Sequence, residues 1–137
     1  MTDPDLRERN LGILQGHRYE ELMQMYPEIM ASFKVDGNDI PVPGGESLSE
    51  CNERLAAFME RTADGNPGKR ILIVTHGGAL QCMFRHAVGV TAPGNIRPFS
   101  GNAAISVFRR KKKAWQLITW NDCNHLRLVP QKDTLVY

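Results

Sequence analysis

A histidine between an apolar run and two glycines is the residue whose setting most clearly indicates chemistry. His76 follows Thr75 and the apolar residues 71–74, and Gly77-Gly78 comes directly after it. Ligands of open α/β sheets bind at the carboxyl ends of strands, where a following helix directs free N–H groups and its positive dipole end toward an anion. We therefore expect His76 to donate to a phosphoryl oxygen. A histidine that only shapes the turn is the alternative.

A second group of reactive residues lies near the start of the chain. Arg7, Glu8 and Arg9 stand together, and Gly12 and Gly16 follow at a four-residue step. A loop of this kind places a carboxyl group beside guanidinium groups, and arginine matches phosphate with two parallel hydrogen bonds. The segment therefore predicts an acid and cations over an anion, although a solvated charged terminus has the same composition.

The helices that position these groups follow from the spacing of apolar residues. Residues 18–33 have apolar side chains at three- and four-residue steps, but Pro27 interrupts them, which predicts two short helices. Ser47 and Glu50 form a capping-box pattern, so we expect a helix that ends near residue 65. Residues 36–45 are rich in turn formers and predict an exposed loop.

The remaining segments predict strands and one more helix. Residues 70–75 indicate a short buried strand, because four consecutive apolar residues lie between turn formers. A helix that begins at residue 79 and is stopped by Gly89 follows, and residues 103–108 and 115–120 predict a hairpin. This order indicates an α/β fold with a mostly parallel sheet, in which strand 70–75 lacks a neighbour.

Composition limits the classes of partner. The chain has 137 residues, 42% hydrophobic and 23% charged, as in one globular domain. The net charge of +2 argues against nucleic-acid or membrane binding, and five positive charges lie together at residues 109–113. We expect this run to form a solvated hairpin tip, with nucleic-acid binding as the alternative. Three widely spaced cysteines argue against a disulfide framework and a zinc site, and indicate a reducing compartment.

The sequence contains no segment typical of a membrane or of export. Its longest apolar run, residues 71–74, is far shorter than the ~20 residues of a membrane helix. The polar opening over residues 1–5 resembles neither a signal peptide nor a transit peptide. We expect a cytoplasmic location, unless a longer form of the chain carries a targeting segment.

Four stretches, taken in order, resemble the histidine phosphatase superfamily, in the branch of cofactor-dependent phosphoglycerate mutases and similar small phosphatases. They are Leu-Arg-Glu-Arg through Leu-Gln-Gly at 6–16, Val-Pro-Gly-Gly-Glu-Ser at 42–47, Val-Thr-His-Gly-Gly at 74–78 and Gly-Asn-Ala at 101–103. The resemblance implies a three-layer α/β sandwich. Residues 1–137 would be the C-terminal portion of that single domain, truncated at the N-terminus.

The resemblance also implies roles for individual residues. In that family one histidine, within Arg-His-Gly-Glu, attacks phosphorus and carries the phosphoryl group. A second histidine and two arginines hold the oxygens, while a carboxylic acid protonates the leaving group. By motif position the second histidine is His76 and the acid is Glu8, with Arg9 at the substrate and Gly77 and Asn102 at the phosphate pocket. Another branch has an aspartate donor where Gly77 stands, which favours Glu8 as the acid.

The sequence departs from the family in one decisive respect. No Arg-His-Gly occurs in the 137 residues, and His17, His86 and His125 match no family motif. We therefore expect a phosphomonoester hydrolase of this family with little or no activity in this form. A non-catalytic phosphate-binding or interaction module is the alternative.

The expected partner is a small phosphorylated metabolite, bound without a metal or another cofactor. The substrate, and the choice between phosphatase and mutase, stay open. The missing neighbour of strand 70–75 predicts an unpaired edge, and therefore self-association.

Overall fold

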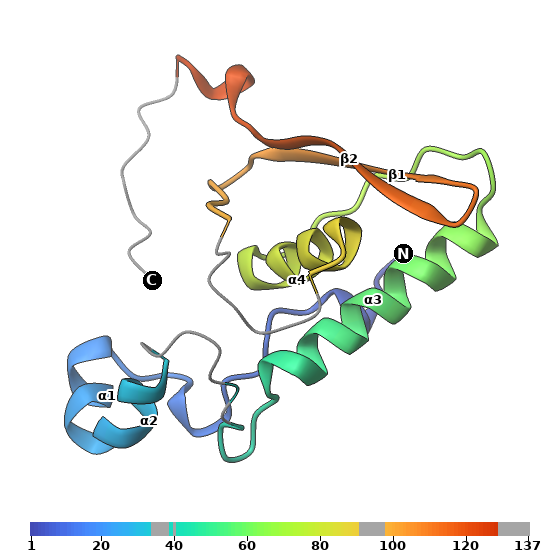
Figure 1. Ribbon diagram of the computed structural model, residues 1–137. Coiled ribbons are helices and arrows are strands. Elements are labelled where there is room, and N and C mark those ends of the chain that lie inside the picture. The colour runs from blue at the N-terminus through green and yellow to red at the C-terminus, as the bar shows by residue number, and fades with distance from the viewer. Residues whose placement is uncertain (34–38, 40, 91–97, 129–137) are drawn as a thin grey trace.

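A computed structural model describes residues 1–33, 39, 41–90 and 98–128, which have mixed α/β content (Figure 1). The helices are α1 (Tyr19–Met25), α2 (Pro27–Ser32), α3 (Leu48–Gly65) and α4 (Gly77–Val88), and the strands are β1 (Ile105–Lys111) and β2 (Ala114–Asp122). Short 3-10 turns cover Pro4–Leu6, Gly12–Leu14 and Asn124–Leu126. Among these elements, no helix is both long and apolar enough to cross a lipid bilayer.

Helices α1 and α2 form a small unit of their own, at some distance from the hairpin (Figure 1). The predicted break is confirmed: Tyr26 ends α1 and Pro27 opens α2, where its missing N–H costs no helical hydrogen bond. Their core consists of four buried side chains, Leu14, Leu22, Met30 and Val42. Part of the predicted loop 36–45, at residues 34–38 and 40, lies outside the described residues.

The main core lies between α3 and α4, and α4 lies between α3 and the hairpin (Figure 1). The capping box is confirmed, since Ser47 Oγ accepts from the N–H of Glu50 and the Glu50 carboxylate accepts from the N–H of Ser47. Leu55 is fully buried on α3. The core is completed by Cys51, Phe58 and Met59 of α3 and by Ala79, Cys82 and Met83 of α4. Burial of this shared apolar face is what holds the two helices together.

The prediction of a buried strand at residues 70–75 is wrong. This segment has no regular secondary structure, and Leu72 and Val74 are 92% and 85% exposed. Ile73 packs on the α3–α4 core, and Thr75 Oγ1 donates to the Leu6 carbonyl at 2.8 Å. A strand needs a hydrogen-bonded neighbour, and none of the described strands pairs with this segment.

The predicted parallel sheet is also absent from the described residues, where the sheet is the antiparallel β1–β2 pair. The three-layer arrangement and the single domain over residues 1–137 stay predictions. Self-association through the unpaired segment 70–75 also stays a prediction. Light scattering at high protein concentration tests it, and a clean monomer would contradict it.

The predicted hairpin is confirmed, with longer strands than expected. The basic run does not lie wholly at its tip: residues 109–111 belong to β1, and Lys112 and Lys113 form the turn with φ of 47° and 65°. A two-residue hairpin turn requires such positive φ values because they match the twist of the strands. Arg110 points to the helices rather than into solvent, and its Nη1 donates to Glu60 Oε1 of α3 at 2.6 Å.

Glu60 ties the hairpin to both long helices. Its Oε1 also accepts from Trp115 Nε1 at 2.6 Å and lies 2.8 Å from His86 Nε2 of α4. Although partial burial raises the pKa of Glu60, hydrogen bonds from Arg110, Trp115 and His86 outweigh it and lower this pKa to about 2. The ionised carboxylate is therefore the form that docks the hairpin.

Replacing Glu60 with glutamine should weaken this docking and flatten the acid dependence of stability. An unfolded glutamate takes up a proton near pH 4.5, whereas folded Glu60 does so only near 2. Its contribution is thus present above pH 4.5 and lost as the pH falls toward 2. We expect a loss of about 1–2 kcal/mol at pH 7, because solvent screens a side chain that is 35% exposed. Urea unfolding at several pH values measures it, with exposed Glu53→Gln as the control; identical pH profiles for E60Q and E53Q would contradict it.

Candidate functional site

The carboxylate of Glu8 lies at the N-terminus of α4. Its Oε2 accepts from the N–H of Gly78 at 2.9 Å, and its Oε1 accepts from the N–H groups of Ala79 at 2.9 Å and Arg9 at 2.8 Å. The first N–H groups of a helix have no partner within the helix, and the dipole favours an anion there. The structure thus brings the two predicted segments together. The Gly78 and Ala79 N–H groups, which were expected to bind a phosphate, bind the Glu8 carboxylate instead.

Gly78 permits this close approach. A Cβ at residue 78 would lie 2.5 Å from Glu8 Oε1, closer than side-chain contacts allow. The bond from Thr75 to the Leu6 carbonyl adds a second link between the same two segments. The glycine pair after His76 is therefore explained by the carboxylate that packs against it.

His76 and Gly77 offer the donors that Glu8 does not use. His76 is the residue before the first turn of α4, its side chain makes no capping hydrogen bond, and it is exposed. Across the described ranges, the Gly77 N–H also has no hydrogen-bond partner. Glu8 Oε2 accepts one hydrogen bond and Oε1 accepts two, so Oε2 keeps an open position. An exposed imidazole, a free N–H and an available carboxyl oxygen thus share one helix end.

Among the described residues, the side chains of Arg9 and Asn102 are not joined to this helix end, although the backbone N–H of Arg9 donates to Glu8 Oε1. The Nε of Arg9 donates to the Glu46 carbonyl at 2.9 Å, and its guanidinium lies 5.6 Å from the ring centroid of Phe33. Asn102 is exposed in the turn before β1. Within the described part of the chain it makes no hydrogen bond to Glu8 or His76. The substrate-binding roles of Arg9 and Asn102 stay predictions.

Sequence reasoning missed the ion pair that holds Glu8 in place. Arg54 of α3 binds Glu46 with both ends of its guanidinium, Nε to Oε1 at 2.8 Å and Nη2 to Oε2 at 2.7 Å. The side chains are only 10% and 12% exposed. Hydrogen bonding from Arg54 lowers the pKa of Glu46, so the pair stays ionised. The burial of Arg54 could have been predicted, because this residue falls on the same helical face as Cys51 and Leu55.

Arg54 also holds the backbone before Glu8. Its Nη1 donates to the Asp5 carbonyl at 2.6 Å and to the Arg7 carbonyl at 3.2 Å. The Glu46 carboxylate accepts from the N–H of Asn10 at 3.0 Å on the other side of Glu8. The carboxylate at α4 is therefore anchored to α3 from both sides.

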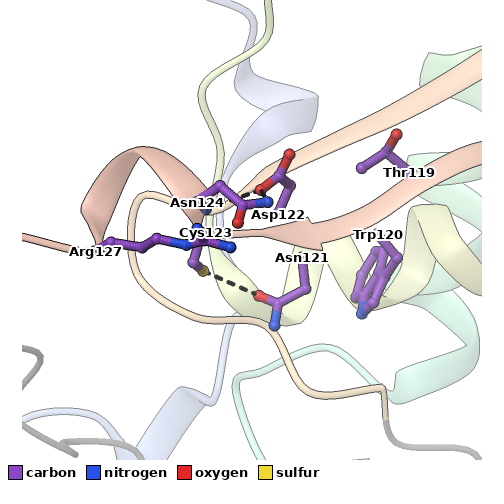
Figure 2. A pocket seen from close by; sticks show the side chains of 7 residues that line it. All are labelled: Thr119, Trp120, Asn121, Asp122, Cys123, Asn124 and Arg127. Atoms are coloured by element: carbon purple, nitrogen blue, oxygen red, sulfur yellow. Dashed lines mark hydrogen bonds between the residues drawn. The ribbon is translucent and has the colours of Figure 1, made fainter.

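A separate open hollow lies at the end of β2 (Figure 2). Its described lining residues are Thr119, Trp120, Asn121, Asp122, Cys123, Asn124 and Arg127. Asn121 Oδ1 accepts from the Gly101 N–H at 2.7 Å, so this end of the hairpin positions the turn that carries Asn102. Glu8 and His76 do not line the hollow.

No group of three histidine, cysteine or acidic side chains suited to a metal occurs in the residues that the structure describes. The carboxylates with the most contacts, Glu46 and Glu60, are already bound to arginines.

The comparisons with known proteins decide the family. A sequence model described as Histidine phosphatase superfamily (branch 1) matches residues 1–123. The chain belongs to this superfamily. The predicted family is thereby confirmed, and similar members of the family carry both phosphatase and mutase names.

Among histidine phosphatase relatives, Phosphoglycerate mutase-like protein 4 of Arabidopsis thaliana is 34% identical, over 92% of this chain and 54% of its own length. The Metal-independent phosphoserine phosphatase of the same plant is 32% identical, over 92% and 52%. Probable phosphoglycerate mutase GpmB of Cronobacter sakazakii is 32% identical, over 92% and 61%. The chain thus spans about half to three fifths of the length of these relatives.

Solved histidine phosphatase structures show the same fold. Bacillus stearothermophilus YhfR superposes with a TM-score of 0.84 at 21% identity, covering 91% of this chain and 62% of that one. Mycobacterial glucosyl-3-phosphoglycerate phosphatase Rv2419c, solved with inorganic phosphate, gives 0.69 at 20% identity, covering 88% and 63%. The described elements therefore form part of the histidine phosphatase fold.

Proposed function

We propose that this chain carries the acid-and-second-histidine half of a histidine phosphatase site. The observation that supports the proposal is the contact between Glu8 and the first turn of α4, directly beside His76. Such an arrangement suits a phosphomonoester, because one side faces the phosphoryl oxygens with donors and the other offers a carboxyl group to the leaving oxygen. The partner class is a small phosphorylated metabolite.

The reaction supported by a complete site of this kind has two steps. A neutral imidazole attacks phosphorus, the bond to the leaving oxygen breaks, and Glu8 gives that oxygen a proton from Oε2. His76 and the Gly77 N–H hold the other phosphoryl oxygens as charge develops on them. Water then attacks the phosphohistidine and returns a proton to Glu8, which releases phosphate and restores the imidazole.

The 137 residues supply the acid and the second histidine, but none of them matches the motif of the attacking histidine. No Arg-His-Gly occurs in them, and the other three histidines lie elsewhere: His86 binds Glu60, His17 lies 3.9 Å from Glu21, and His125 is exposed in the last 3-10 turn. We propose that the chain as given binds a phosphate group with little or no turnover. A phosphate-binding module without catalysis is the second candidate, favoured by the same free donors at His76 and Gly77.

Hydrolysis of p-nitrophenyl phosphate by the purified chain tests the proposal. His76→Ala and Glu8→Ala define the background, and His17→Ala, on the exposed surface, is the matched control. We expect wild type, H17A and the two site variants to show the same negligible rate. Turnover in wild type and H17A that both site variants abolish would mean that a nucleophile exists within these residues, and the proposal would fail.

A further inference from the structure

Two buried cysteines face each other across the interface of α3 and α4. Cys51 is 0% exposed and Cys82 is 2% exposed, and their Sγ atoms lie 3.5 Å apart. A disulfide bond is about 2.05 Å long, so the sulfur atoms need to approach by about 1.5 Å. The helices already pack against each other along this face, so the two sulfur atoms are neighbours in the folded chain.

The two thiols differ in how readily they ionise. The Cys82 thiol donates to Cys51 Sγ, which lowers the pKa of Cys51 and raises that of Cys82. Nη2 of Arg54 also lies 3.4 Å from Cys51 Sγ and adds a positive charge beside it. Cys51 is therefore the attacking sulfur, and Cys82 is placed to resolve it.

We propose that Cys51 and Cys82 are a redox pair that a peroxide oxidises to a disulfide, locking α4 onto α3. The Cys51 thiolate attacks one oxygen of hydrogen peroxide, the O–O bond breaks, and Cys51 becomes a sulfenic acid as hydroxide leaves. The Cys82 thiol then attacks that sulfur and expels water as the S–S bond forms. In total, two thiols lose two hydrogen atoms and one peroxide becomes two water molecules.

The crosslink would act next to the helix end that binds Glu8. Cys82 is one helical turn after Gly78, whose N–H donates to Glu8. On the other helix, the guanidinium that touches Cys51 also holds the backbone of Asp5 and Arg7. Oxidation would join the two supports of the Glu8 carboxylate covalently. The bond would also close a loop between α3 and α4, which restricts the unfolded chain and stabilises the fold.

Burial restricts which reagents reach the pair. In the closed packing neither sulfur atom is open to a molecule of the size of water, so hydrogen peroxide reaches them through small local openings between α3 and α4, which large reagents cannot use. Cys123 is the internal comparison: it is a free, partly exposed thiol whose Sγ donates to Asn121 Oδ1 at 3.9 Å (Figure 2). A bulky maleimide should therefore label Cys123 alone in the native chain.

Hydrogen peroxide treatment of the full native chain tests the pair. Intact mass should fall by two hydrogen atoms, a non-reducing peptide map should show a Cys51–Cys82 crosslink, and the melting temperature should rise by several degrees until a thiol reductant reverses it. The peptide map of the wild-type chain tests the proposal without relying on a variant that could fail to fold. Cys123→Ala should form the same crosslink, whereas Cys51→Ala and Cys82→Ala should not.

Four outcomes would overturn the proposal. The first three are a crosslink that contains Cys123, a crosslink that forms only in urea, and a Cys51 that gains oxygen atoms while Cys82 stays reduced. Unreacted Cys51 and Cys82 after complete oxidation of Cys123 would overturn it as well, because the pair would then be closed to peroxide in the folded chain.

Discussion

Replacing Arg54 with alanine should lower the free energy of unfolding by about 3–5 kcal/mol, the usual cost of breaking a buried ion pair on one side. Glu46 would keep its charge in a site that is only 12% exposed, and would lose both guanidinium hydrogen bonds. The carbonyls of Asp5 and Arg7 would lose their donor at the same time. Urea denaturation followed by circular dichroism measures the change.

Arg61 provides the matched control on the same helix. Its side chain is 54% exposed, and it pairs with Asp3 and Asp5 at 2.8 and 3.0 Å. Solvent screens surface pairs of this kind, so Arg61→Ala should have little effect on the free energy of unfolding. Equal losses for R54A and R61A would contradict the anchoring role of Arg54.

The second large effect is expected at Gly12, which lies where two loops approach most closely. Its φ is +49°, and a Cβ there would overlap the Pro43 carbonyl oxygen and the backbone nitrogen of Gly45. Backbone atoms cannot move aside as a flexible side chain can. Gly12→Ala should therefore cost at least about 2 kcal/mol, from left-handed strain and steric overlap together.

Gly16→Ala separates these two causes. Gly16 also has a positive φ, +83°, but a Cβ there would meet no atom within 4 Å. Gly16→Ala should therefore show only the cost of the left-handed backbone conformation, which is about 1 kcal/mol. If thermal unfolding found G12A and G16A equally stable, the close contact between the loops would not be an important source of stability.

The helices could be predicted because their signals are local. Pro27 interrupts the periodicity of residues 18–33, and the break between α1 and α2 lies there. Ser47 caps α3, and Gly89 ends α4 with a φ of +76°. In each case the deciding interaction involves residues a few positions apart, so a local sequence pattern is enough to predict where the helix begins or ends. Only the start of α4 differed, at Gly77 rather than residue 79.

The errors arose where the structure depends on distant partners. Residues 70–75 have the composition of a buried strand, but whether such a run is buried depends on a neighbour that local sequence does not describe. Arg110 counted as one of five solvated cations, yet Glu60, 50 positions away, binds it. The contact between Glu8 and Gly78 spans 70 positions. Only the resemblance to a family placed these residues in one site before the structure did.

The position of Glu8 sharpens the expectation for phosphate. Its carboxylate already binds the N–H groups of Gly78 and Ala79, so an incoming phosphate meets the imidazole of His76 and the N–H of Gly77 first. We therefore expect a bound phosphate to lie beside the open position of Glu8 Oε2. This is the arrangement that a proton donor to a leaving oxygen requires.

A titration of the ¹⁵N-labelled chain with inorganic phosphate, followed by amide NMR at constant ionic strength, tests the central claim most directly. If the chain binds phosphate at this helix end, the shifts saturate and are centred on His76 and Gly77. His76→Ala abolishes them, and His17→Ala leaves them intact. Shifts confined to residues 109–113 that never saturate would indicate a screening effect on the basic run. That result, or the absence of any shift at residues 76–79, would contradict the account.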